Sequence, residues 1–241
     1  MQQTLEEALA RVLRLPAAAR TVVAGRTDAG VHAAGQVVHV DLAEAPDPLR
    51  LRRGLNGVLP ADVRVRAVGV APRGFDARFS ATRRRYGYRI TDGVPDPLRR
   101  TDTLAWPRAL DETRMQQAAD RLLGEHDFAA FCKQREGATT IRRLLRLACA
   151  REDAVLTLTV EADAFCHSMV RALTGALIAV GEGRRAVEWP AEVLAAGVRS
   201  SAVAVAPAHG LTLLEVGYPA DDELATRATA TRRLRVLGDT G

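Results

Sequence analysis

The stretch Ala24-Gly25-Arg26-Thr27-Asp28-Ala29-Gly30-Val31-His32 decides how the N-terminal part of this chain is organised. It follows the apolar run 21–23 and precedes the alternating run 36–41, so we predict two strands flanking a loop. The glycines of the loop permit positive φ or close backbone approach, and can therefore place the Asp28 carboxylate in one unusual position. Polar loops at strand ends commonly build active sites. The alternative is a solvated turn in which Asp28 bonds to its own backbone, and the loop alone leaves both interpretations open.

The composition is that of a globular protein. The chain has 241 residues, of which 47% are hydrophobic, enough for one large domain or two small ones. It contains neither a membrane-spanning apolar stretch nor a signal-peptide pattern, so we expect a cytoplasmic protein. The cysteines Cys132, Cys149 and Cys166 are odd in number and widely spaced. We therefore expect reduced cysteines in the core, and neither a disulfide framework nor a zinc site.

The charge favours a polyanionic partner, with a formal net charge of +5. Lys133 is the only lysine among 34 basic residues, and the others are arginine. Because a GC-rich genome also produces arginine-rich chains, the clustering of arginines indicates more about RNA binding than their number does.

The order of predicted elements indicates an α+β fold. A capping box at Thr4 and Glu7 predicts an opening helix, and residues 92–107, with three prolines, read as a linker. Further helices are predicted at residues 49–58, 115–123, 164–180 and after Pro190, and strands at 63–70, 83–90, 141–150, 155–162 and from 211. We expect two αβ-sandwich halves with mainly antiparallel sheets, at 1–100 and 101–220, and a loosely ordered polar tail at 221–241.

Two polar patterns are ambiguous when taken singly. On a strand, Tyr86 and Tyr88 share one face with Arg84, which fits either an arginine-blunted edge strand or a surface that stacks and holds nucleic acid. His167, Arg171 and Thr174 form a polar stripe along a predicted helix, which is more often a solvated face than a site.

Several stretches in one order match a known family, and together the chain resembles tRNA pseudouridine synthase A. The motifs are Ala24-Gly25-Arg26-Thr27-Asp28-Ala29-Gly30-Val31-His32-Ala33 with Gly35-Gln36-Val37-Val38-His39; Arg84-Arg85-Tyr86-Gly87-Tyr88; Gly124-Glu125-His126-Asp127-Phe128 with Phe131; Phe165 with Met169-Val170-Arg171 and Val180-Gly181-Glu182-Gly183; and Ala206-Pro207-Ala208-His209-Gly210-Leu211. One such motif is weak, whereas this many in register are specific.

The resemblance implies two ferredoxin-like halves, a basic cleft between them and a homodimer. It implies an isomerase that converts uridine to pseudouridine in the tRNA anticodon stem-loop, at tRNA positions 38 to 40, without metal or organic cofactor. By position, Asp28 matches the catalytic aspartate, Tyr86 the tyrosine that stacks on uracil, and Arg171 the arginine that pairs with the carboxylate. Arg26 resembles the arginine that helps to expel and replace the flipped base, and we expect Arg84 and Arg85 to hold RNA phosphates.

One departure concerns the N-terminus. Family members begin with a strand bearing Asp-Gly and then Gly-Trp-Gln motifs, and this chain starts after them; we interpret this as a start site assigned too late. The alternatives are a catalytically impaired, truncated RNA-binding copy of the family, or a nucleoside hydrolase that uses a lone aspartate. Pseudouridine formation and free uracil release would distinguish them.

Overall fold

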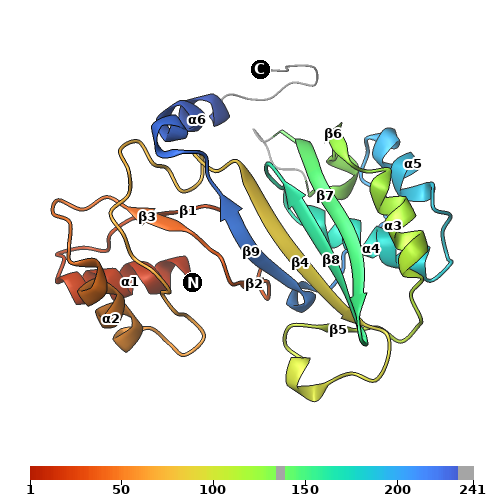
Figure 1. Ribbon diagram of the computed structural model, residues 1–241, viewed down its shortest axis with the longest axis horizontal. Coiled ribbons are helices and arrows are strands. Elements are labelled where there is room, and N and C mark those ends of the chain that lie inside the picture. Colours follow the sequence, from red (N-terminus) through yellow and green to blue (C-terminus); the bar gives the residue numbers. More distant parts are fainter. Residues whose placement is uncertain (134–138, 233–241) are drawn as a thin grey trace. The chain divides into compact units, whose positions relative to one another are not determined.

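The computed structural model describes residues 1–133 and 139–232. Its contacts divide the chain into two compact units (Figure 1). Unit one comprises residues 1–25, 37–81 and 219–231, and unit two comprises the described parts of 26–36, 82–218 and 232. The ranges 1–100 and 101–220 stay a prediction. In this division Asp28, Tyr86 and Arg171 all belong to unit two.

Unit one is built on two helices, α1 (Gln2–Leu13) and α2 (Pro48–Val58), and on the antiparallel strands β1 (Thr21–Val23) and β3 (Val38–Val40). The helices bury a leucine-rich stripe at Leu9, Leu51 and Leu55. Both helices and both strands were expected. The capping box was wrong: α1 already begins at Gln2, so Thr4 lies inside the helix, and the Glu7 carboxylate accepts from Gln3 Nε2 at 2.7 Å. The neighbouring Glu6 accepts hydrogen bonds from the backbone N–H and Oγ1 of Thr21, each at 2.8 Å.

The strand predicted at 63–70 is absent from the described structure. Val63, Val65 and Val68 do pack against the helices, as the alternation suggested. However, the Asn56 side chain bonds both the N–H (2.8 Å) and the C=O (2.9 Å) of Val65. This amide takes the place that a neighbouring strand would occupy, so the segment is extended without joining a sheet.

The first part of the predicted loosely ordered tail is helical. A 3₁₀ turn at Asp221–Glu223 leads into α6 (Leu224–Thr231). Leu224 and Ala228 lie one turn apart and are buried, and Ser80 Oγ donates to the Leu224 carbonyl at 3.1 Å. Burial of these two apolar residues and the hydrogen bond from Ser80 thus hold the helix in unit one. Residues 233–241 lie outside the described part.

Unit two contains a seven-stranded, mainly antiparallel sheet in the order β2-β9-β4-β8-β7-β6, with β5 beside β4. Only the β2–β9 and β4–β5 pairings among the described strands are parallel. The strands are β2 (His32–Ala33), β4 (Arg83–Thr91), β5 (Leu104–Ala105), β6 (Gly124–Asp127), β7 (Ile141–Glu152), β8 (Val155–Ala162) and β9 (Leu211–Gly217). The fold class is therefore α+β, as expected.

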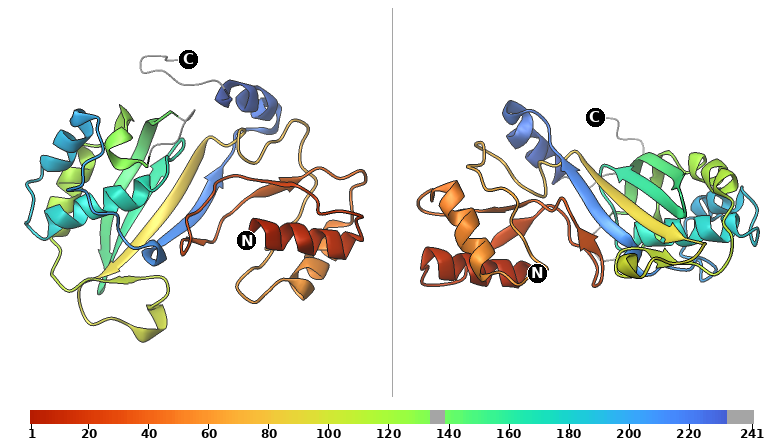
Figure 2. Two further views of the ribbon diagram at one scale, coloured as in Figure 1. Left: turned by 180° about the vertical axis from the view of Figure 1, so that it is seen from behind. Right: turned by 60° about the horizontal axis from the view of Figure 1, so that its bottom comes forward.

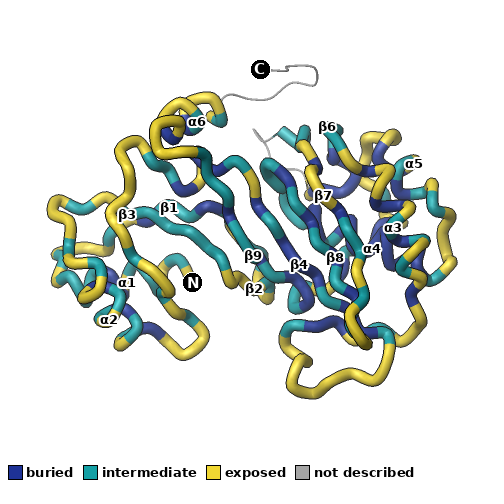
Figure 3. The backbone as a smooth tube through the Cα atoms, viewed as in Figure 1, coloured by how far each residue is buried: buried dark blue, intermediate teal, exposed yellow. Residues whose placement is uncertain are grey.

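Three helices cover one face of this sheet: α3 (Glu112–Asp120), α4 (Met169–Gly181) and α5 (Trp189–Ala196) (Figure 2). Every second residue of β8 is buried under them, from Leu156 to Ala162. Cross-strand pairing puts Tyr86 opposite Val160 and Tyr88 opposite Leu158, so both tyrosines share this face, as predicted. Figure 3 shows β4 and β8 as the most buried strands of the unit.

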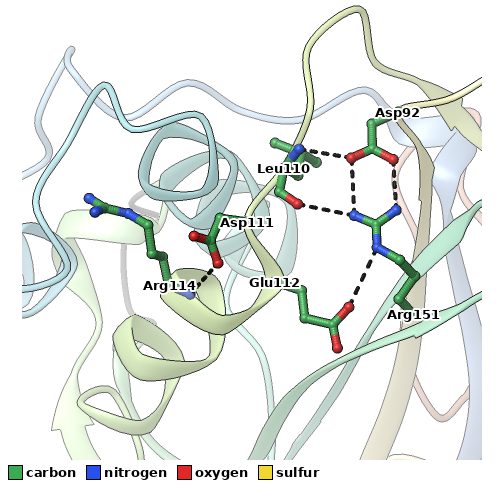
Figure 4. A network of polar contacts seen from close by, with 6 residues as sticks. All are labelled: Asp92, Leu110, Asp111, Glu112, Arg114 and Arg151. Carbon is green, nitrogen blue, oxygen red and sulfur yellow. Dashed lines mark hydrogen bonds and ion pairs between the residues drawn. The ribbon is translucent and has the colours of Figure 1, made fainter.

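The predicted linker 92–107 is tied to the sheet. It contains a 3₁₀ turn at Pro97–Arg99 as well as β5. At its start the Asp92 carboxylate receives two hydrogen bonds from Arg151 of β7, at 2.7 and 3.0 Å, and one from Leu110 N–H at 2.8 Å (Figure 4). Arg151 also donates to the Leu110 carbonyl at 3.1 Å, which closes the network.

The cysteines differ from the sequence-based expectation. Cys132 and Cys166 form a disulfide, with their Cα atoms 5.7 Å apart, and Cys149 is free. Next to the disulfide, Lys133 N–H donates to His167 O at 3.0 Å. The fold thus places two segments side by side that are 34 residues apart in the sequence. Spacing along the sequence carries no signal for this tertiary proximity.

Candidate active site

The loop 26–36 is held by the edge of the sheet in unit two. Its strand β2 pairs with Thr212 and Leu213 of β9, and Val31 N–H donates to Asp28 O at 3.1 Å. Gly30 has φ of 82°, which glycine adopts without steric cost. A Cβ at Gly35 would lie 2.1 Å from the Leu214 carbonyl, so only glycine permits this approach. The glycines thus fix the backbone that carries Asp28.

Three side chains surround the Asp28 carboxylate. Arg171 Nη1 donates to Oδ2 at 2.9 Å, and Ser168 Oγ lies 3.4 Å from the same oxygen. His167 Nε2 lies 3.2 Å from Oδ1. The Asp28 and Arg171 side chains are 25% and 20% exposed, so the pair is partly shielded from water yet open enough to meet a substrate.

These three partners come from the first turn of α4 and the residues just before it. The helix begins at Met169, five residues later than predicted, and Ser168 takes the left-handed conformation with φ of 65°. For a residue other than glycine this conformation costs energy and is found more often at functional sites. It turns the chain so that the positive end of the helix dipole and its side chains meet a carboxylate.

Arg171 also links α4 to the segment before β9. Its Nε donates to the Ala206 carbonyl at 2.7 Å, and Ala206 N–H donates back to Arg171 O at 3.0 Å. The next residue, Pro207, accepts from the Tyr88 hydroxyl at 2.7 Å. The guanidinium is therefore fixed on one side, which leaves Nη1 directed at Asp28.

Tyr86 lies within the sheet and is 7% exposed. Its ring meets Phe165 edge to face, with centroids 5.2 Å apart. Burial raises the pKa of Tyr86 to about 12; the charge of Arg84 opposes this shift and that of Asp28 adds to it. The phenol is consequently neutral across the physiological range.

The predicted RNA-binding arginines have different surroundings. Arg84 is 8% exposed and donates to Asp163 O at 2.8 Å, and Arg85 pairs with Glu215. Arg26 is exposed and makes no hydrogen bond or ion pair with any other residue that the structure describes. Arg26 is thus exposed without such a partner, while Arg84 and Arg85 have partners within the protein, although the Arg85 side chain is still 37% exposed.

Comparison with known proteins identifies the family. Residues 118–219 match the family model described as tRNA pseudouridine synthase. A tRNA pseudouridine synthase A of Frankia casuarinae is 62% identical over 239 residues, covering 98% of this chain and 87% of the relative. The chain belongs to the tRNA pseudouridine synthase A family.

Other family members give the same result. The proteins of that name from Streptomyces griseus and Mycobacterium leprae are 55% and 51% identical, over 100% and 96% of this chain and 87% and 86% of their own lengths. As a member of the tRNA pseudouridine synthase A family, the chain is an isomerase that forms pseudouridine in tRNA. Within residues 1–133 and 139–232, no helix is long and apolar enough to cross a membrane, and no group of three potential metal ligands occurs.

The sequence did not identify two of the residues that contact Asp28, His167 and Ser168. His167 was noticed only as part of a polar stripe, and Ser168 had been placed inside a continuous helix. The available signal was the run of polar residues directly before the apolar stripe of α4, since side chains at a helix start can face a neighbouring carboxylate. Phe165 belonged to a recognised motif, but its contact with Tyr86 depends on the tertiary fold.

Proposed function

We propose that this synthase isomerises uridine in the tRNA anticodon stem-loop, at positions 38 to 40, and that Asp28 is the carboxylate that acts on the ribose. The observation that carries the proposal is the Asp28–Arg171 pair, with Nη1 and Oδ2 2.9 Å apart, in the same unit as Tyr86. Arg26 and Tyr86 are proposed to handle the flipped base.

The reaction needs a charged carboxylate and no external donor. The bond from ribose C1′ to uracil N1 breaks, the base turns, and C1′ bonds to C5. The C5 hydrogen then leaves as a proton and N1 gains one, so the atoms balance without an oxidant or group carrier. Asp28 acts either as the nucleophile at C1′ or as the base at C2′. Arg171 balances its charge and fixes its position beforehand, which is how preorganised sites lower a barrier.

The base has to leave its stack before it reaches Asp28. Flipping costs a few kcal/mol, and stacking on an aromatic ring returns roughly 1–3 kcal/mol per base. Tyr86 is the proposed ring, although little of its surface is exposed. Phe165 holds that ring edge-on, so we expect the Phe165 side chain to move when uracil enters. Exposed Arg26 is proposed to fill the space that the base leaves.

A tritium-release assay tests the proposal. A tRNA transcript labelled at C5 of uridine loses tritium to water when the C1′–C5 bond forms. We expect Asp28→Asn and Asp28→Ala to abolish release while tRNA binding persists. Exposed Asp62, which has no partner among the described residues, provides the matched control Asp62→Asn. Substantial release by either Asp28 variant would refute the role of Asp28.

The position of the target is tested with the same assay. Transcripts in which the anticodon-arm uridines are replaced by cytidine should release no tritium, while replacement elsewhere should have no effect. The contrary pattern would exclude the proposed target. Free uracil among the products would favour a hydrolase, and binding without any release would favour an impaired RNA-binding copy.

The assembly rests on the family resemblance alone. We propose two ferredoxin-like halves, a homodimer and a basic RNA-binding cleft, and no metal or organic cofactor. Sedimentation of the purified protein with and without tRNA measures the oligomeric state, and a monomer under both conditions would remove the dimer from the proposal.

A further inference from the structure

Both oxygens of Asp28 are held, but by different kinds of donor. Oδ2 receives the Arg171 guanidinium at 2.9 Å and has the Ser168 hydroxyl at 3.4 Å. Among the residues that the structure describes, Oδ1 has one polar contact, with His167 Nε2 at 3.2 Å. Contacts to one oxygen alone leave the carboxylate plane able to rotate about its bond to Cβ. A contact to the second oxygen fixes that plane.

The surroundings of the His167 ring determine which nitrogen carries the proton. Nδ1 is buried and has no hydrogen-bond partner within the described residues. A proton on Nδ1 would be a buried donor without an acceptor, and would leave the Nε2 lone pair facing the Oδ1 lone pairs. With the proton on Nε2, the ring donates to the carboxylate and only an acceptor is left unsatisfied. The ring therefore has a donor, Nε2–H, 3.2 Å from Oδ1.

The backbone of His167 is held independently of Asp28. Its carbonyl accepts from Lys133 N–H at 3.0 Å, and Cys166 before it is bonded to Cys132. Ser168 after it has the left-handed backbone conformation. Since the residue is restrained on both sides, its ring can act as a rigid support for Asp28.

We propose that His167 is a positioning residue that fixes the plane of the Asp28 carboxylate, so that Oδ1 is the oxygen presented to the ribose. A carboxylate oxygen has two lone pairs, and Oδ1 uses one of them for His167. Oδ2 is engaged by a charge-assisted bond, the stronger kind, and by the serine hydroxyl. Oδ1 thus combines a fixed direction with a free lone pair. The inference rests on the proposed role of Asp28.

A matched set of substitutions tests this role. Gln at position 167 can place its Nε2–H₂ where the imidazole Nε2–H lies, and Phe keeps the ring shape without a donor. Asn is one methylene shorter than Gln, so its amide does not reach Oδ1, and it is a second variant without a donor at Oδ1 if Phe disturbs folding. Urea unfolding of each variant monitors the fold.

The kinetic readout separates positioning from simple destabilisation. We expect His167→Phe and His167→Asn to lower kcat about 10- to 100-fold, the size expected when a reacting group loses its alignment. KM for tRNA should change little, because the Nε2 side of the His167 ring faces Asp28 and its Nδ1 is buried. His167→Gln should stay within about three-fold of the unaltered enzyme and keep the shape of its pH–rate profile, since the amide again puts a donor beside Oδ1.

The outcomes that overturn the inference are equally clear. Full activity in a folded variant without a donor at Oδ1 would show that the His167 contact is dispensable. A Gln variant as slow as the Phe variant, or one that loses a limb of the pH profile, would show that His167 transfers a proton instead. Failure of the proposed function looks different: the unaltered enzyme would form no pseudouridine, or Asp28→Asn would remain active.

Discussion

Removing the Arg171 guanidinium is the most informative perturbation of this site. Arg171→Ala deletes both the 2.9 Å bond to Asp28 Oδ2 and the 2.7 Å bond to Ala206 O. Arg171→Lys keeps the positive charge but has a single ammonium, which cannot reproduce the rigid fork that reaches both acceptors. The two variants therefore separate the contribution of charge from that of geometry.

The magnitude follows from the bonds lost. A hydrogen bond to a charged group contributes about 1.5–3 kcal/mol, and each 1.4 kcal/mol corresponds to a factor of ten. If the Asp28 contact is needed in the transition state, kcat/KM of Arg171→Ala should fall roughly 10- to 100-fold. Loss of the bond from the charged Arg171 Nε to the Ala206 carbonyl should lower the free energy of unfolding by about 1.5–3 kcal/mol. Arg171→Lys should lie between the unaltered enzyme and the Ala variant.

Tritium release under single-turnover conditions measures the chemical step, and filter binding measures the affinity for tRNA. Arg199 is exposed and has no partner among the described residues, so Arg199→Ala controls for the loss of one arginine charge. A folded Arg171→Ala enzyme with chemistry within about three-fold of the unaltered rate would refute the pairing argument. So would a loss that lies entirely in tRNA affinity.

Two further predictions concern stability. Asp92→Asn should lower the free energy of unfolding by about 1.5–3 kcal/mol at neutral pH, measured by urea titration. Hydrogen bonding from Arg151 lowers the pKa of Asp92 in the folded protein. Its contribution to the free energy of unfolding is therefore present above the pKa of an unfolded aspartate and is lost as the pH falls through the lowered folded pKa. The stability of Asp92→Asn should depend less on acid pH, and an unchanged dependence would contradict this. Gly175→Ala should destabilise by about 1–3 kcal/mol and reduce activity, because its Cβ would lie 1.8 Å from Ala204 O, near the Ala206 anchor of Arg171. The control Gly57→Ala, with open space in α2, should be neutral or slightly stabilising, and equal effects of the two changes would refute the steric argument.

Much of the secondary structure was predictable because it depends on local pattern. The strict alternation of 155–162 predicted β8 with its bounds, and the apolar periodicity predicted α2 and α4. The errors arose where a side chain or a distant segment replaced a local rule. The Asn56 side chain accepts the backbone N–H of Val65 that a neighbouring strand would otherwise bind. Ser168 is the N-cap of α4, so this helix begins later than the apolar stripe suggests.

The sequence by itself determined the family, the α+β class and the identity of the candidate carboxylate. These depend on motifs and periodicities that can be recognised along the chain without knowledge of its fold. It also placed glycines where the loop needs them, as Gly30 demonstrates. Only the tertiary structure decided what surrounds Asp28. Arg171 and His167 lie some 140 residues away along the chain and reach the carboxylate because the start of α4 lies against the loop 26–36. A hydrogen bond depends on distance and direction in space, and the sequence separation of its partners specifies neither.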